Sequence, residues 1–337
     1  MIQKVLKTIK EYDLIKNGDR LVLGVSGGPD SISMLDILNK IRIDETNNLS
    51  FNIVVAHINH MIRAEAIEDQ QFVEKFCKEI GVEFYSKSID IQKIANNNKI
   101  GTEEAGRNAR YEFFDEILKK TNSNKVAIAH NKNDKAETMI MNLLRGSGIA
   151  GLKGIEPIKN NKYIRPLIEC ERYEIEQYCE ENNIKARIDK TNFENIYTRN
   201  KIRNIIIPYI KQEFNPNIIQ TLDRLANLVK EEDDYLQKLV EEKYNNMLIE
   251  EKEKEIIMDL KKFNKEEKVI KSRILLYTIT RLFGTTKGIE KIHIEDVIKM
   301  CSNNIGNKYL TPNKNIKILL KNHKIYFINQ KWGAVKV

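Results

Sequence analysis

The sequence predicts an α/β protein with a doubly wound, mostly parallel sheet, followed by a mainly helical C-terminal domain. Over roughly the first 210 residues, short apolar runs alternate with segments of helical periodicity, which is typical of repeated βα units. After about residue 215 this alternation gives way to long, charged helical stretches. Strands separated by helices imply a parallel sheet that is covered on both faces.

Local patterns justify the elements in turn. The expected strands are short apolar runs bounded by turn residues, at 21–25, 51–57, 82–88 and 125–130. An i, i+3, i+4, i+7 stripe of Met34, Ile37, Leu38 and Ile41 predicts a helix after the first strand. Further amphipathic helices are expected at residues 2–9, 65–80, 102–120, 218–248 and 265–283. Beyond residue 215, only residues 317–329 resemble a strand.

Length and charge indicate two domains. The chain has 337 residues, with 56 Lys and Arg against 48 Asp and Glu, and a net charge of +8; about 150 residues per domain is a common size. Pro216 cannot continue a helix, so the boundary is expected beside it, giving domains of residues 1–214 and 215–337. Residues 261–337 alone carry a net charge of +12. This basic end is expected to contact nucleic acid, although a solvated lysine-rich surface has the same composition.

Other features exclude several classes of protein. No apolar run approaches the ~18 residues that a membrane span needs. The charged N-terminus lacks the apolar stretch of a signal peptide, so a cytoplasmic protein with no membrane partner is expected. The four cysteines, Cys77, Cys170, Cys179 and Cys301, lie far apart without a C-x-x-C pair. Neither a zinc site nor a redox dithiol is therefore indicated, and buried thiols are expected.

The most informative segment is S-G-G-P-D-S at residues 26–31, between the first strand and the following helix. A glycine-rich turn here lets backbone N–H groups converge on an anion, and the helix N-terminus adds its positive dipole end. The expected phosphate-binding residues are Ser26, Gly27, Gly28, Pro29, Asp30 and Ser31. Because the Asp30 carboxylate would repel a phosphate unless a cation lay between them, the loop predicts a polyphosphate bridged by Mg²⁺, with Asp30 as metal ligand.

This motif resembles the signature of the PP-loop ATP pyrophosphatases. The resemblance implies an enzyme that uses ATP and Mg²⁺, cleaves ATP between the α and β phosphates, and leaves an adenylated substrate and pyrophosphate. The loop lacks the Lys of the G-x-x-x-x-G-K-[ST] pattern, which argues against an NTPase that transfers the γ-phosphate. The motif does not specify the substrate.

Further segments narrow the substrate. They are H-I-N-H-M-I-R at 57–63, E-A-G-R-N-A-R-Y at 104–111, A-H-N-K-N-D-K-A-E-T at 129–138, L-R-G-S-G at 144–148, R-P-L at 165–167, D-K-T-N-F at 189–193 and Y-T-R-N-K-I-R at 197–203. Over about the first 215 residues they resemble the tRNA(Ile)-lysidine synthetases. The resemblance implies a tRNA-modifying ligase that adenylates the C2 oxygen of the wobble cytidine in the CAU anticodon of tRNA(Ile). Free L-lysine then displaces AMP and forms lysidine. A homodimer is compatible with this interpretation.

That chemistry needs carboxylates as well as phosphate ligands. Lysine must attack as a neutral amine although its free pKa is near ~10.4, so the site must bind the ammonium group and accept its proton. Asp134 and Glu137, at i and i+3 after a strand end, fit this role. The alternative is a helix-capping arrangement, with Asp134 as the cap, and both interpretations can hold together.

The remaining predicted residues are basic. Guanidinium groups bind anions in bidentate fashion, so Arg110 is assigned to catalysis, and other basic residues to tRNA. The predicted tRNA-binding residues are Arg107, Arg145, Arg199, Lys201 and Arg203. Surface ion pairs and a solvated helix face are the alternatives. The family resemblance implies that His57 and His130 lie around the ATP.

Four residues depart from those usual in the family: Asn59 replaces Asp, Met61 replaces Gly, Asn131 replaces His and Lys135 replaces Gln. None removes a proposed catalytic group. Compared with longer members, the chain is expected to carry one C-terminal module rather than two.

Two other functions remain open. The first is a PP-loop tRNA thiolase, which would need paired reactive cysteines or an iron–sulfur cluster. The second is a non-catalytic RNA-binding protein on the same fold, which would have no use for the added negative charge of Asp30, Asp134 and Glu137.

Overall fold

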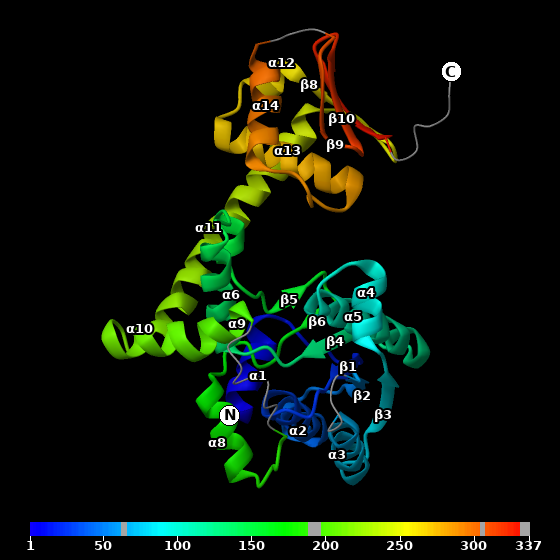
Figure 1. The fold of residues 1–337 in the computed structure, drawn as a ribbon, viewed down its shortest axis with the longest axis vertical. Helices are drawn as coiled ribbons and strands as arrows, with labels where there is room; N and C mark the ends of the chain where they lie inside the picture. The colour runs from blue at the N-terminus through cyan, green and yellow to red at the C-terminus, as the bar shows by residue number, and fades with distance from the viewer. Residues whose placement is uncertain (62–65, 188–196, 304–306, 331–337) are drawn as a thin grey trace. The chain divides into compact units, whose positions relative to one another are not determined.

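The computed structural model describes residues 1–61, 66–187, 197–303 and 307–330. The chain divides into two compact units, Met1–Val229 (unit 1) and Lys230–Val337 (unit 2), whose elements are labelled in Figure 1. No helix within the described ranges combines the length and the apolar character needed to cross a bilayer. Arg63 and the predicted motif at residues 189–193 lie outside the described residues.

A six-stranded sheet forms the centre of unit 1, in the order β3-β2-β1-β4-β6-β5. Its strands are β1(Arg20–Gly24), β2(Asn52–Asn59), β3(Glu83–Ser88), β4(Lys125–Ile128), β5(Ile158–Lys159) and β6(Tyr163–Ile164). Neighbouring strands are parallel, except for β5 and β6. The predicted doubly wound sheet is therefore confirmed. The strand order reverses between β1 and β4, and ligands of such sheets bind at the carboxyl ends of the strands beside this switch point.

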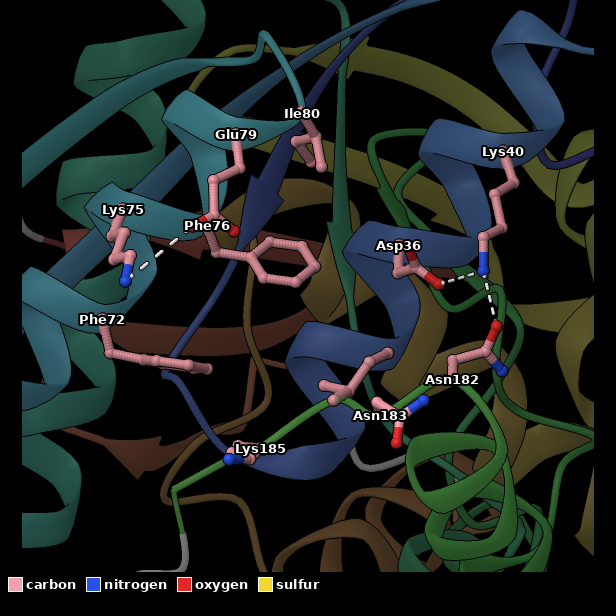
Figure 2. Close-up of a pocket in the computed structure, with 11 residues that line it drawn as sticks. Asp36, Lys40, Phe72, Lys75, Phe76, Glu79, Ile80, Asn182, Asn183 and Lys185 are labelled. Atoms are coloured by element: carbon pink, nitrogen blue, oxygen red, sulfur yellow. Dashed lines mark hydrogen bonds and ion pairs between the residues drawn. The ribbon is translucent and has the colours of Figure 1, made fainter.

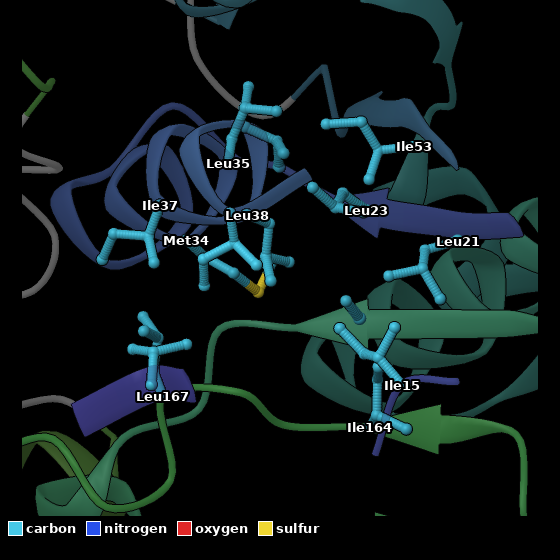
Figure 3. Packing of buried hydrophobic residues seen from close by; sticks show 14 of the residues in the cluster. Ile15, Leu21, Leu23, Met34, Leu35, Ile37, Leu38, Ile53, Ile164 and Leu167 are labelled. Atoms are coloured by element: carbon cyan, nitrogen blue, oxygen red, sulfur yellow. The ribbon is translucent and has the colours of Figure 1, made fainter. Parts of the chain in front are cut away.

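Helices cover both faces of this sheet (Figure 1). The helices that lie wholly within unit 1 are α1(Ile2–Glu11), α2(Pro29–Ile43), α3(Ala66–Glu79), α4(Ile91–Asn98), α5(Thr102–Thr121), α6(Lys132–Leu144), α7(Ile149–Leu152), α8(Arg172–Glu181), α9(Thr198–Lys201) and α10(Ile207–Glu213), with a 3-10 turn η1(Glu45–Asn47) and a π-helical turn η3(Ile202–Ile206). Successive side chains of β1 point to opposite faces of the sheet and pack in different hydrophobic cores. Leu21 and Leu23 pack with α2, and Val22 packs with α5. Figure 3 shows the first core, where Met34 and Leu38 of the predicted α2 stripe are fully buried.

The helix α11(Ile218–Met247) begins in unit 1 and ends in unit 2. Its Ile219 shares a buried cluster with Ala136 of α6, Ile202 of η3 and Ile207 of α10. These contacts hold the α9–η3–α10 segment against α6. The compact units divide within α11, whereas the predicted domains divide after residue 214, and the functional assignment of the two domains stays a prediction.

A buried ionic network also joins α6 to α11 within unit 1. Lys132 Nζ lies 3.0 Å from an Asp223 oxygen and 3.1 Å from a Glu169 oxygen. Lys135 Nζ lies 2.7 Å from the other Asp223 oxygen and donates to Asn227 Oδ1 at 2.8 Å. Two ammonium groups thus share one aspartate, which explains how lysine is accommodated at position 135. Buried charges of this kind need their partners, because removing one leaves the other uncompensated.

Unit 2 combines helices with a five-stranded antiparallel sheet in the order β7-β8-β11-β10-β9. Its elements after α11 are β7(Leu248–Lys252), β8(Glu255–Asp259), α12(Leu260–Asn264), α13(Lys268–Phe283), α14(Lys291–Ser302), β9(Tyr309–Asn313), β10(Ile316–Lys321) and β11(Lys324–Asn329). The predicted helices correspond to α11 and α13, and the predicted strand segment is the β10–β11 hairpin. The sequence did not predict β7, β8 or β9, each only five residues long.

The β10–β11 turn offers a test of local strain. Asn322 and His323 have φ of 51° and 56°, as a two-residue type I′ turn requires, and glycine is preferred over histidine there. The substitution His323→Gly is expected to raise the free energy of unfolding by about 0.5–1 kcal/mol, because it relieves the left-handed strain. Urea unfolding measures the change. In the β9–β10 turn, Lys314 has no positive φ, so Lys314→Gly should instead lower stability; a loss in both variants would contradict the strain argument.

Candidate active site

The predicted phosphate loop joins β1 to α2 at the switch point of the sheet. Gly27 has φ of +95°, a left-handed conformation that glycine adopts without strain, and Gly28 caps α2, with Pro29 at its first position. The Ser31 hydroxyl accepts hydrogen bonds from the amides of Ser26 and Gly27 at 3.1 and 3.2 Å and donates to Gly28 O at 3.0 Å. Ser31 therefore shapes the loop from within the first turn of the helix.

The second glycine of the loop, Gly28, is explained better by a bound anion than by close packing within the protein. Its φ is −74°, and a Cβ at Gly28 would lie 3.7 Å from Ser26 Oγ and 3.9 Å from Arg187 O, which are ordinary contacts. The protein alone thus leaves room for a side chain here. A phosphate approaching the N-terminus of α2 would need the same space, which is the usual reason for glycine in such loops.

The predicted metal ligand, Asp30, lies in the first turn of α2. Burial and the nearby Asp134 carboxylate raise the pKa of Asp30 to about 6, against the opposing charge of Arg172. Asn131 Nδ2 donates to Asp30 Oδ1 at 3.1 Å. Within the described residues, no group of three or more His, Cys, Asp or Glu side chains is arranged to hold a metal. A cation at Asp30 would thus need phosphate oxygens as further ligands, and it would relieve the repulsion between the two carboxylates.

The start of α6 supplies the second carboxylate group. Asn131 caps the helix, its Oδ1 accepting from the Asp134 amide at 3.0 Å, while Asp134 Oδ2 accepts from the Asn131 amide at 3.1 Å. The capping alternative is thus correct in kind but wrong in position, because the cap is Asn131 and Asp134 is the third residue of the helix. This box uses one oxygen of Asp134 and leaves Oδ1 for other partners.

Those partners are two arginines from the α9–η3 segment. Asp134 Oδ1 lies 3.1 Å from Arg199 Nη2 and 3.0 Å from Arg203 Nη2. Glu137, only 1% exposed, pairs with Arg199 Nε at 2.8 Å and Arg203 Nε at 2.6 Å. The structure therefore brings the predicted catalytic carboxylates together with two of the predicted tRNA-binding residues. We call Asp134, Glu137, Arg199 and Arg203 the four-charge cluster.

The cluster has consequences for ionisation. Burial alone would raise the pKa of Asp134, but the positive charges of Arg199 and Arg203 and the hydrogen bond from the Asn131 amide outweigh it and lower the pKa, so this carboxylate stays ionised at neutral pH. Lys201 is exposed. Of the three basic residues predicted in this segment for tRNA, Lys201 is thus the one most open to solvent.

The predicted histidines lie around the loop and the cluster as neutral rings. His57 Nδ1 bonds the Val25 carbonyl at 2.9 Å and so supports the start of the phosphate loop. Burial lowers the pKa of His57 and lowers that of His130 to about 4. His130 Nδ1 accepts from Arg165 Nε at 3.2 Å. Arg165 belongs to the R-P-L motif at residues 165–167, but no local pattern predicts its contact with His130.

His60 was not among the predicted site residues, yet it has an unsatisfied buried atom. Its Nδ1 has no hydrogen-bond partner among the described residues, and a Cβ at Gly106 would lie 3.9 Å from that atom. Burial, followed by the charge of Arg110, lowers the pKa of His60 to about 4. The ring is therefore a neutral group able to bond a polar ligand.

The other predicted arginines are dispersed. Arg107 stacks on the Tyr111 ring, with its guanidinium carbon 5.2 Å from the ring centroid. Arg110 is exposed to solvent, yet desolvation by the surrounding protein lowers its pKa, and the charge of Arg107 adds to this effect. Arg145 caps the C-terminus of α6 and is exposed. Arg107 and Arg110 lie close enough to form one basic rim, which would attract a phosphate.

One departure from the residues usual in the family, Met61, has a strained backbone conformation. Met61 has φ of +53°, and its amide donates to Asn59 Oδ1 at 2.9 Å. Left-handed backbone explains why glycine is usual at this position, since methionine adopts it only with strain.

A pocket of about 400 Å³ lies away from the phosphate loop, between α2, α3 and the segment after α8. Figure 2 shows Phe72 and Phe76 on the α3 side, and Lys40 bonded to Asp36 and Asn182 on the other. Three lysines line this pocket, Lys40, Lys75 and Lys185, but none of the predicted site residues does. The pocket is therefore not the predicted ATP site.

Comparison with known proteins agrees with these motifs. A family model described as a PP-loop domain matches residues 1–210. The tRNA(Ile)-lysidine synthase of Clostridioides difficile (strain 630) is 42% identical over 332 residues, covering 98% of this chain and 71% of that protein. This chain belongs to the tRNA(Ile)-lysidine synthase family. The corresponding protein of Clostridium tetani is 44% identical, with 95% of this chain and 67% of that protein covered, so the chain spans about two thirds of its relatives' length.

A solved structure supports the fold. The U34-tRNA thiolase NcsA from Methanococcus maripaludis, described with its [4Fe-4S] cluster, aligns over 67% of this chain and 78% of its own, with a TM-score of 0.54 and 21% identity. At that identity the likeness concerns the fold alone.

The raised pKa of Asp30 gives a stability prediction. The native state holds the proton more tightly than the unfolded chain, so ionised Asp30 destabilises the fold as pH rises from about 4 to 6 and beyond. In metal-free protein, Asp30→Asn is expected to raise the free energy of unfolding at pH 8 by about 1–2 kcal/mol, and by progressively less toward pH 4. Urea unfolding across this range measures it.

The control for this prediction is Glu116→Gln, at an exposed carboxylate paired with Lys87. This change should alter stability by no more than about 0.5 kcal/mol. A variant Asp30→Asn that is less stable than the parent at pH 8 would show that the ionised carboxylate is not strained.

Proposed function

We propose that this chain ligates free L-lysine to C2 of the wobble cytidine of the CAU-anticodon tRNA(Ile), through an adenylated tRNA, giving lysidine, AMP and pyrophosphate. The observation that carries the proposal is the meeting of a phosphate loop and a carboxylate pair at one switch point. Asn131 bonds Asp30 on one side and Asp134 on the other. Family membership and the names of the relatives support the same activity.

The adenylation half of the reaction requires the loop residues. Ser26 to Ser31 would hold the β and γ phosphates through main-chain amides and the N-terminus of α2. Bound Mg²⁺, with Asp30 as its protein ligand, would neutralise charge on the departing pyrophosphate. His57 supports the start of the loop through its bond to the Val25 carbonyl. Arg110 and Arg107 would attract phosphate at the edge of the site.

The lysine half requires the four-charge cluster. Free lysine presents an ammonium group, and the ionised Asp134 is suited to bind it because its pKa is lowered. Arginine now satisfies both carboxylates, so the incoming ammonium would replace part of an existing ion pair rather than meet a bare charge. That exchange avoids the desolvation of an unpaired carboxylate. The RNA would be held by Arg145 and Lys201, which are exposed, and by the basic unit 2.

The thiolase alternative receives no support from the cysteines. All four are buried and free, and burial raises the pKa of Cys77, Cys170 and Cys301 to about 12. Thiols in that state are poor nucleophiles. The non-catalytic alternative does not account for the buried carboxylates, whose negative charge would weaken RNA binding.

A direct assay tests the proposal. Purified full-length protein is incubated with ATP, Mg²⁺, labelled lysine and the CAU-anticodon tRNA(Ile), and label is then sought in the RNA. We expect incorporation that requires ATP and that disappears when the wobble cytidine is replaced by uridine. If the protein binds this tRNA but no label enters the RNA, the ligase proposal is rejected and the non-catalytic RNA-binding alternative remains.

A substitution separates the two halves of the reaction. Asp134→Asn removes the charge but preserves the size of the side chain, so it should raise the KM for lysine about 10–100-fold, the value of one charge-assisted hydrogen bond. Because the phosphate loop is untouched, the KM for ATP should change less than about threefold. Glu116→Gln serves as the matched carboxylate control and should change neither constant. Equal effects on lysine and ATP would contradict the division of roles.

A further inference from the structure

We propose that the outer face of the unit 2 sheet binds unpaired nucleotides of the tRNA by stacking them on two tyrosines, Tyr309 and Tyr326. This inference rests on the proposed tRNA substrate and goes beyond it by naming a surface and a mode of recognition. We call the surface the tyrosine face; it comprises Tyr309, Lys317, Leu319, Lys321, Lys324 and Tyr326.

The sheet has one covered side and one that its own helices leave open. Alternate residues of β10 and β11, such as Ile318, Leu320, Ile325 and Phe327, are buried in the core of unit 2 with α13 and α14. In Figure 1 the helices of this unit lie on one side of its sheet. Because successive side chains of a strand point to opposite faces, the residues between these positions form the other face.

Strand register places the aromatic residues of that face in one row. Leu319 pairs with Tyr309 on one side and with Tyr326 on the other. Tyr326 in turn pairs with the buried Ile257 of β8, which pairs with Glu250 of the edge strand β7. Tyr309 is 56% exposed, and Leu319 and Tyr326 are partly exposed. Two strand spacings separate the tyrosines by about 10 Å, room for two bases that are splayed apart.

Lysines surround the tyrosines. Lys317 Nζ lies 4.5 Å from the centroid of the Tyr309 ring. Lys321 and Lys324 are directly paired at the far end of the β10–β11 hairpin. The neighbouring strand β8 places two acids beside this face, because Glu255 pairs with Ile328 and Asp259 pairs with Lys324. The Asp259 side chain is engaged in capping α12, where it accepts from the Lys262 amide at 2.9 Å. The face therefore combines two aromatic rings with three lysines, and its acids lie on the β8 side.

This chemistry fits single-stranded RNA better than other partners. Unpaired bases stack on aromatic side chains displayed by a sheet, while lysines hold the phosphates between them. A double helix presents no free base faces, and a second protein chain would not require several lysines around the rings. We therefore commit to unpaired tRNA nucleotides as the occupant.

The test compares full-length variants in tRNA binding at fixed salt. The double variant Tyr309→Ala with Tyr326→Ala should bind the CAU-anticodon tRNA(Ile) at least about tenfold more weakly, because stacking on each ring is lost. The double Tyr→Phe variant keeps the rings and should bind within about twofold of the parent. The matched control is Tyr235→Ala, a 69% exposed tyrosine on α11 away from the sheet, which should bind like the parent.

Further measurements identify the ligand and the lysines. A short single-stranded RNA oligonucleotide should compete for the parent protein, and a duplex of the same length should compete poorly. Lys317→Gln with Lys321→Gln should reduce the slope of log affinity against log salt by about 0.7 per lysine, while the Tyr→Ala variant should leave the slope unchanged.

Several outcomes would overturn the inference. Parental tRNA affinity in the Tyr→Ala variant would do so, and so would a change only in oligomeric mass, which would assign the face to contacts between copies of the chain. Weak binding by the Tyr→Phe variant would show that ring stacking is not the cause. If the parent binds tRNA through this face but incorporates no lysine, the proposed function fails while the tyrosine face stands.

Discussion

The site depends on Asn131, because this residue holds two carboxylates that would otherwise repel each other. Its side-chain amide donates to Asp30, and its carbonyl oxygen and main-chain N–H fix Asp134. The two acids belong to helices that follow β1 and β4, the strands on either side of the switch point. The distance between the phosphate loop and the carboxylate pair is thus set by one short side chain at the start of α6.

The four-charge cluster neutralises two carboxylates at buried positions. Glu137 and Asp134 lie at buried positions, where a carboxylate without a partner is strongly destabilising. Arg199 and Arg203 lie four residues apart on one side of a helix, so both can reach the same pair of acids. Arg203 lies within the π-helical turn Ile202–Ile206, and such turns often occur at functional sites. The positive segment and the acidic helix therefore stabilise each other.

The sequence predicted the parts of this arrangement that are local. Strand and helix periodicity located β1 to β4, α2 and α5 to within a few residues, and the loop motif located the turn between β1 and α2. The pairing of Arg199 and Arg203 with acids more than 60 residues away could not be read from local pattern, and the arginines were assigned to RNA because basic residues beside a tyrosine suit phosphate. The strands β7, β8 and β9 were missed because each is only five residues long, too short to show a clear alternation of apolar and polar residues. Asn131 appeared only as a departure from the family, without a sign that it bonds Asp30.

The ionic network of α6 and α11 limits how short a working catalytic fragment can be. Lys132 and Lys135 share Asp223, and Asn227 completes the coordination of Lys135. A chain cut at the end of α10 would lose Asp223 and Asn227, so Lys135 would lose both of these partners and Lys132 would keep its contact with Glu169. The first turns of α11 thus supply the charge that compensates two lysines of α6, the helix that carries Asp134 and Glu137.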